Sequence, residues 1–347
     1  MGLKLTGARD EFVRSRKSQD YAAGTITNNR RHINKLIATT GDIDCRKITP
    51  RHIDQMLAGQ SRVNGSGSLG NMQATLSAFF RWCRSRGYMK PDQDPLAERR
   101  APKHEPKPRL IIPAHKFPAL LDAAGQTHPR DRAVIALGIY TMARQSEIAN
   151  LKIDNLDLDA GELLMFQSKT RTFDVMPVSA ELDSEMRRWL TWYTRKHGNL
   201  DPDWYLVPAR KKGQVRAGTK FIGNPDAALS PTRRVANMHD IAKKAILGVS
   251  ERLTDDTGTP TREGMHTLRR SAARALFDEL QTVGYDGAAR QAQTWLHHAS
   301  MTQTERYLQI TPDRDSRNRR FRGKPLYPSL QDSTVVQLTE YREAHGD

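Results

Sequence analysis

Cysteine, long apolar runs and negative charge are all scarce in this sequence, and each scarcity excludes a class of protein. Only Cys45 and Cys83 are present, far apart in the sequence and without His or Cys neighbours at metal-ligand spacing. We therefore expect buried or idle thiols in a reducing compartment, no disulfide and no zinc. No run of about eighteen apolar residues exists, and the first residues lack the apolar stretch of a signal peptide. These absences favour a cytoplasmic protein without membrane attachment.

The shortage of acidic residues leaves a strongly basic chain. The formal net charge is +16 and the pI is about 10.0. Residues 1–110 hold 21 Lys and Arg against 10 Asp and Glu, net +11, and the remainder is net +5. Such a balance favours a polyanionic partner, with nucleic acid first and an acidic membrane surface second. The N-terminal part is expected to be the stronger electrostatic anchor.

The length of 347 residues exceeds the usual range of a single core, so we expect two domains. Residues 1–98 predict a helical domain, because apolar residues recur at helical spacing over 7–18, 25–39, 49–58 and 68–87. Residues 99–113 contain four prolines and five Lys or Arg, a composition that resists helix formation and predicts an extended linker.

A second domain, residues 114–325, mixes helices with a small sheet. Helices are expected over 114–124, 130–142 and 146–151, and again from 180–197 onward to about residue 307. Residues 162–167 and 172–177 predict two strands around a tight polar turn that holds Lys169 at its tip. In the tail, 326–347, a helix after Ser333 either packs on its own chain or docks on a neighbouring protomer.

Four separated segments carry side chains suited to phosphate chemistry, although each has a plain structural explanation when taken alone. Arg144 follows an apolar helix and can form a salt bridge with Glu147 at i+3. A turn lysine such as Lys169 is usually solvated. Tyr307 follows a helix end and a turn, and a single tyrosine in such a place ordinarily packs against neighbouring side chains.

The third segment pairs a histidine with arginines. His266 and Arg269 share a helix face at i and i+3 and can address one group together. Arg270 at i+4 lies on nearly the same face, so geometry alone does not choose between the two arginines. In the fourth segment His298 precedes Tyr307 by nine positions.

Taken together, the four segments resemble the tyrosine recombinase, or phage integrase, family. The family pattern runs Arg, a β-hairpin Lys, His-x-x-Arg, a His or Trp, and then the nucleophilic Tyr. The residues that match this order are Arg144, Lys169, His266, Arg269, His298 and Tyr307. The segment HASMTQTERY, which ends at Tyr307, is similar to the family's GHSSISTTQRY. The helical N-terminal part resembles the family's core-binding domain.

Three positions depart from the family pattern. His297 stands where Gly usually precedes the motif His, and Met142 stands where Gly is common before the first Arg. Arg270 stands where the family often has a second His, which leaves the assignment of the second arginine open.

The resemblance implies a mainly α fold with a small β-sheet, and a site-specific recombinase that needs no cofactor, metal or ATP. Tyr307 would attack phosphorus to give a 3′-phosphotyrosine, with Arg144 and Arg269 on the phosphate and Lys169 as general acid. His266 would exchange a proton or bind the phosphate, and His298 would donate a hydrogen bond to it.

The resemblance also implies partners. Double-stranded DNA with a specific core site would be bound by a homo-tetramer that joins two sites through a Holliday junction, with an accessory directionality factor in some systems. The core-binding resemblance begins within the first few residues, so no N-terminal arm-binding domain is expected. Two rivals remain: relaxation of DNA by a type IB topoisomerase, and a DNA-binding protein without catalysis.

Overall fold

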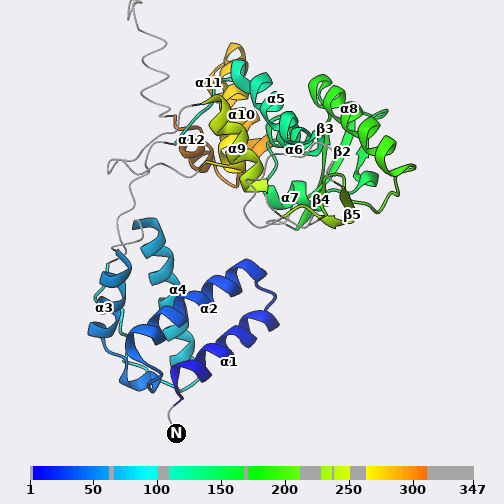
Figure 1. Cartoon of the computed structure of the whole chain (residues 1–347). Helices are drawn as coiled ribbons and strands as arrows, with labels where there is room; N and C mark the ends of the chain where they lie inside the picture. The colour runs from blue at the N-terminus through cyan, green and yellow to red at the C-terminus, as the bar shows by residue number, and fades with distance from the viewer. Residues whose placement is uncertain are drawn as a thin grey trace, which may run out of the picture. The chain divides into compact units, whose positions relative to one another are not determined.

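The computed structural model describes residues 3–61, 66–100, 109–167, 171–211, 228–236, 238–250 and 263–310. The chain divides into two compact units, Met1–Pro106 (unit 1) and Lys107–Asp347 (unit 2), each with a hydrophobic core of its own (Figure 1). The division falls inside the proline-rich segment 99–113. Leu110 and Ile112, which the composition of that segment placed in an extended linker, are buried in the core of unit 2.

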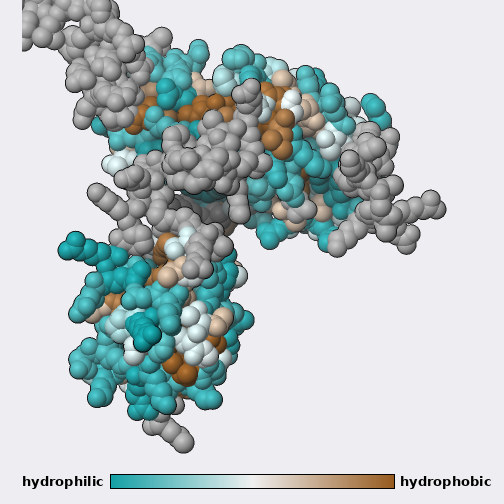
Figure 2. All heavy atoms as spheres, turned by 60° about the vertical axis from the view of Figure 1, so that its left-hand side comes forward, coloured by the Kyte–Doolittle hydropathy of each residue, from teal (hydrophilic) through white to brown (hydrophobic). Residues whose placement is uncertain are grey.

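Unit 1 is helical, as the apolar periodicity predicted. Its elements are α1 (Leu5–Ser18), α2 (Ala23–Thr40), a 3₁₀ turn η1 (Cys45–Lys47), α3 (Pro50–Ser61) and α4 (Ser66–Ser85). Aromatic side chains join α1 to α4, with the rings of Phe12 and Phe79 edge to face at 5.5 Å. Helix α2 buries Ile33 and Leu36 and exposes Arg30 and Arg31, so its outer side is basic. The visible face of unit 1 is mainly hydrophilic (Figure 2).

The two cysteines lie together in the core of unit 1. Both are completely buried and free. A hydrogen bond between the thiols, together with burial, raises the pKa of Cys83. The two cysteines are far apart in the sequence, so the sequence alone does not predict this contact, which joins η1 to α4.

Unit 2 contains the remaining elements. They are η2 (Ala114–Lys116), α5 (Phe117–Thr127), α6 (Pro129–Tyr140), α7 (Gln145–Asn150), η3 (Ile153–Asn155), β1 (Leu156–Asp157), β2 (Glu162–Gln167), β3 (Thr172–Pro177), α8 (Ala180–His197), β4 (Pro208–Arg210), β5 (Leu229–Arg234), α9 (Met238–Val249), α10 (Met265–Glu279), η4 (Leu280–Val283), α11 (Tyr285–Leu296) and α12 (Met301–Leu308). Within the described ranges, no helix combines the length and the apolar character that a membrane crossing requires.

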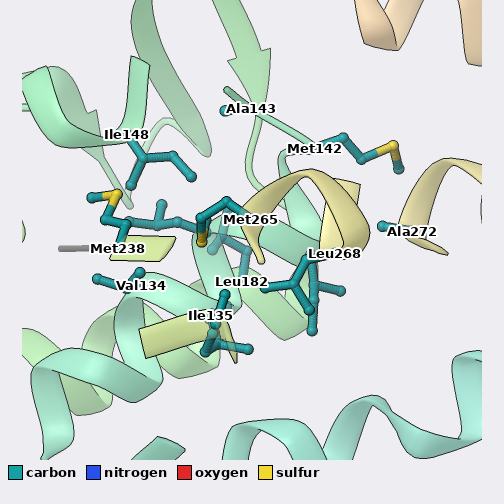
Figure 3. Close-up of a cluster of buried hydrophobic side chains, with 14 of the residues drawn as sticks. Val134, Ile135, Met142, Ala143, Ile148, Leu182, Met238, Met265, Leu268 and Ala272 are labelled. Carbon is teal, nitrogen blue, oxygen red and sulfur yellow. The ribbon is translucent and has the colours of Figure 1, made fainter. Parts of the chain in front are cut away.

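Helix α6 lies at the centre of unit 2. Nearly every residue from Arg130 to Ile139 is buried, and the helix packs against α5, α8, α9 and α10. A helix that is apolar on almost all sides is stable only when other elements surround it. Val134 and Ile135 of α6 lie among side chains of several other elements, including Leu182, Met238 and Leu268 (Figure 3).

The sheet of unit 2 is antiparallel, in the order β1-β2-β3. Strands β2 and β3 begin and end at the residues that the alternating pattern predicted, with Glu162 opposite Pro177 and Gln167 opposite Thr172. A second sheet, β4-β5, was not predicted, because β4 has three residues and β5 contains Pro231 and exposed Arg233 and Arg234. Neither strand shows the alternation of a half-buried strand.

A glycine sets the approach of α10 to α6. A Cβ atom at Gly138 would lie 2.8 Å from the methyl carbon of Met265 and 3.5 Å from Leu268 Cδ1. The missing side chain therefore allows close contact between the two helices. This contact brings the first turns of α10, with His266 and Arg269, toward the loop that follows α6.

Candidate active site

Arg144 is held at the start of α7 by a buried carboxylate. Glu147 is 2% exposed. Its Oε2 accepts from the backbone N–H of Arg144 at 2.6 Å, and its Oε1 accepts from the Arg144 guanidinium at 2.8 Å. The salt bridge between Arg144 and Glu147, which the i+3 spacing suggested, is therefore present. It leaves part of the Arg144 guanidinium accessible to solvent, since the side chain is 19% exposed.

Arg269, on α10, forms hydrogen bonds with two other segments of the chain. The residue is buried on α10. Its guanidinium donates to the backbone carbonyl of Met142, in the loop after α6, and to that of Leu296 at 2.6 Å, at the end of α11. Burial is the main influence on its pKa, which it lowers. A planar fork of donors suits this role, because it can bind several oxygens while keeping N–H groups for an anion.

Tyr307 lies on α12 with its hydroxyl directed to the start of α10. The hydroxyl donates to the backbone carbonyl of His266 at 3.2 Å. Burial raises the pKa of the Tyr307 phenol, and the guanidinium groups of Arg269, Arg270 and Arg144 act in the opposite direction. The hydroxyl is therefore protonated at neutral pH and surrounded by positive charge.

Two side chains pack on the ring of Tyr307. The His298 ring lies edge to face with it, with centroids 5.2 Å apart and an interplanar angle of 82°. The guanidinium carbon of Arg270 lies 5.5 Å from the Tyr307 centroid. His298 is itself held, because its Nδ1 contacts Thr304 Oγ1 at 3.2 Å.

The segment before η2 closes around the same region. Ile112 N–H donates to Ser271 Oγ at 2.9 Å, and Arg270 donates to the carbonyl of Leu110 at 3.4 Å. The side-chain amide of Gln309 accepts from the backbone N–H of Arg109 at 2.9 Å and donates to its carbonyl at 3.0 Å. The first described residues of unit 2, from Arg109 to Ile112, thus contact α10 and the end of α12.

His266 has an imidazole that favours its neutral form. The residue is exposed at the surface, yet neighbouring protein atoms displace part of the water around the ring. This loss of water, followed by the charges of Arg269, Arg270 and Arg144, lowers the pKa of His266 below its usual 6.5, and Glu147 opposes the shift. The ring can therefore accept a proton at neutral pH.

The structure gathers five of the six predicted site residues in unit 2: Arg144, His266, Arg269, His298 and Tyr307. Lys169 lies outside the described residues, between the end of β2 and the start of β3 in the sequence. Arg270, left open by the sequence, also contacts Tyr307. Glu147 has a clear part in holding Arg144, and its spacing from Arg144 was the signal.

Both glycine departures from the family pattern lie where the backbone is left-handed. Met142 has φ 52° and His297 has φ 49°. Non-glycine residues pay about 1 kcal/mol for this conformation. Each position makes a connection to the site, since the Met142 carbonyl binds Arg269 and His297 precedes His298. The left-handed backbone explains why the family usually has glycine at these two positions. Met142 and His297 adopt this conformation although non-glycine residues disfavour it.

The chemistry available to these residues is that of phosphate esters. Guanidinium groups can stabilise non-bridging oxygens, a tyrosine hydroxyl can act as nucleophile, and a neutral histidine can accept its proton. In the part of the chain that the structure describes, no three His, Cys, Asp or Glu side chains gather as a metal site would require.

Comparison with known proteins gives a consistent family. The model of the phage integrase family matches residues 111–314. Tyrosine recombinase XerC of Xylella fastidiosa (strain M23) is 26% identical over 307 residues, which are 87% of this chain and 91% of that protein. The corresponding XerC of Pseudomonas putida (strain W619) is 24% identical, over 85% of this chain and 88% of that protein.

Solved structures share the fold. A lambda integrase dimer bound to a COC′ core site is similar with a TM-score of 0.64 and 19% identity, over 88% of this chain and 95% of that chain. A lambda integrase tetramer bound to a Holliday junction gives 0.64 and 20%, over 88% and 77% of the two chains. Since the family model covers more than half of the sequence, the chain belongs to the phage integrase family of tyrosine recombinases.

Proposed function

We propose that this protein is a site-specific DNA recombinase that cleaves and rejoins DNA through a covalent bond to Tyr307. The observation that carries the proposal is the set of residues that surrounds the side chain of Tyr307. The charges of Arg269, Arg270 and Arg144 act on it, His298 and Arg270 pack on its ring, and α10 supplies the carbonyl that it binds. These side chains come from separate segments that meet at one tyrosine.

The arginines would stabilise the charge that builds up on the scissile phosphate. Arg144, oriented by Glu147, and Arg269 would donate to the non-bridging oxygens, with His298 adding a further donor. Guanidinium stays charged at any physiological pH, so these contacts do not depend on a proton. In this role Arg269 would act with the N–H groups that Met142 and Leu296 leave unused.

The covalent step transfers the phosphoryl group without loss of bond energy. The Tyr307 oxygen bonds to phosphorus while the bond from phosphorus to the 5′-oxygen breaks, giving a 3′-phosphotyrosine and a 5′-hydroxyl. His266 would take the phenolic proton, and Lys169 would protonate the leaving oxygen. The assignment of Lys169 rests on its place in the family pattern. Attack by a 5′-hydroxyl of another strand then reverses the step and restores Tyr307, so ATP is not consumed.

The partner would be duplex DNA with a specific core site. The basic balance of residues 1–110 and the exposed Arg30 and Arg31 of α2 favour contacts to phosphates. We propose unit 1 as the core-binding domain and unit 2 as the catalytic domain. By likeness to the lambda integrase tetramer on a Holliday junction, four copies would join two sites.

A two-site assay separates this function from its rivals. Plasmids carrying two copies of candidate sites from the sequence that flanks the gene would be incubated with the protein, in the presence of EDTA. Exchange between the sites supports the recombinase. Relaxation of supercoils without exchange favours a type IB topoisomerase, and DNA binding with neither product favours a protein without catalysis.

A further inference from the structure

The hairpin formed by β2 and β3 is fastened to the active-site segment by a contact that the family pattern does not contain. His297 Nε2 lies 3.3 Å from Asp174 Oδ2, with side chains 21% and 40% exposed. Asp174 is in β3, opposite Met165, and its Oδ2 also accepts from the side-chain amide of Gln167 at 3.4 Å. Gln167 is the last residue of β2, so the contact reaches the strand ends that flank Lys169.

The other end of the contact adjoins the site directly. His297 ends α11 in a left-handed conformation, with φ 49° and ψ 48°. The next residue, His298, packs on Tyr307. Since a glycine would adopt this backbone freely, the imidazole is retained at a cost, and its contact with Asp174 offsets that cost.

We propose that His297 is a positioning residue, whose imidazole, through its contact with the Asp174 carboxylate, holds strands β2 and β3 against the turn between α11 and α12. In terms of the proposed function, on which this inference rests, the contact holds the strand ends that flank Lys169 in the sequence beside the segment that carries His298 and Tyr307. His297 would therefore act through these strands.

Burial favours the neutral form of the His297 imidazole in this contact. The groups that face His297 are Asp174 on β3, Arg269 on α10, and Arg144 and Glu147 on α7. Burial lowers the pKa of His297, Arg269 and Arg144 act in the same direction, and Asp174 and Glu147 oppose them. The contact therefore does not require a charged histidine.

Hydrogen exchange of the full chain without DNA tests the contact. In His297→Gly and in Asp174→Ala, the amides of β2 and β3 should exchange about threefold to tenfold faster, as expected for loss of one polar contact. His297→Gln places an amide nitrogen near the position of Nε2 and should restore slow exchange. Asp159→Ala removes a carboxylate that is 97% exposed near the same sheet and should leave exchange as in the wild type.

The double variant His297→Gly, Asp174→Ala should exchange no faster than Asp174→Ala alone, because Asp174→Ala already removes the contact with His297. Additive effects, or unchanged exchange in both single variants, would overturn the inference. On cleavable DNA, His297→Gly should slow covalent bond formation while leaving DNA affinity unchanged, and His297→Gln should recover the rate. If the wild type itself forms no covalent product, the proposed function fails, and the exchange data still decide the contact.

Discussion

The hydroxyl of Tyr307 donates to the backbone carbonyl of His266, 3.2 Å away, and so the proposed nucleophile is bound to the same residue whose side chain is proposed to accept its proton. This hydrogen bond holds the phenol at the first turn of α10. An incoming phosphate would have to displace it before attack. In the proposed mechanism, this hydrogen bond would hold Tyr307 in place before the phosphate binds.

The lowered pKa of His266 predicts the pH dependence of cleavage. If neutral His266 accepts the phenolic proton, the rate of covalent bond formation should be constant above pH 6.5, the usual histidine value, and fall only at lower pH, where the ring becomes protonated. The rate would be measured across pH on a nicked DNA substrate. His266→Gln should be slower and should lose this acid limb. An identical limb in the variant would assign it to another group.

Glu147 is predicted to serve both stability and activity through Arg144. Glu147→Ala removes both acceptors that hold Arg144, and should lower the free energy of unfolding by about 2 kcal/mol. Glu147→Gln keeps an acceptor and should cost less. Urea unfolding gives the stability, and covalent bond formation gives the activity. Wild-type values for Glu147→Ala in both measurements would contradict the role assigned to the pair.

Arg269 and Arg270 can be separated by matched substitutions. Arg269→Lys keeps the charge but not the fork that reaches two carbonyls, so it should lose about 1–3 kcal/mol of stability and slow covalent bond formation by about 100-fold or more. Arg270→Lys should change stability by less than about 1 kcal/mol, since Arg270 is partly exposed and its contact with Leu110 is long. Greater loss of cleavage in Arg270→Lys would make Arg270 the second catalytic arginine.

Four histidines predict that the protein is less stable in mild acid. Burial lowers the pKa values of His32, His197, His266 and His297 below the usual 6.5. As pH falls below 6.5 the unfolded chain binds protons before the folded chain does, so their contribution is complete above 6.5 and is lost as pH falls through the folded values. Urea unfolding at about pH 8 and about pH 5.5 should show the decrease. Equal stability at both would contradict it.

Much of the fold follows from local pattern in the sequence. Helix α8 and strands β2 and β3 have the predicted bounds, because amphipathic spacing and alternation are strong there and Ser179 accepts from Leu182 N–H as an N-cap. The sheet β4-β5 was missed because β4 has only three residues and β5 contains Pro231. Such strands depend on pairing between distant segments, which local periodicity does not report.

The sequence predicted which residues form the site, but it predicted few of the contacts between them. The order of the motifs identified the candidate residues, and α6, α10 and α12 bring together the candidates that the structure describes. The contact of His297 with Asp174 had no signal in the sequence, since it joins a helix end to a strand far away along the chain. The left-handed backbone at Met142 was likewise hidden, because methionine rarely adopts it.

The central claim is that Tyr307 forms the covalent bond to DNA. Wild type and Tyr307→Phe would be incubated in EDTA with duplexes nicked near the cleavage position, so that the cleaved strand diffuses away, and analysed on a denaturing gel. We predict a protein–DNA adduct in the wild type that Tyr307→Phe, still folded and DNA-binding, does not form. An adduct that persists in Tyr307→Phe would contradict the assignment of Tyr307 as the nucleophile.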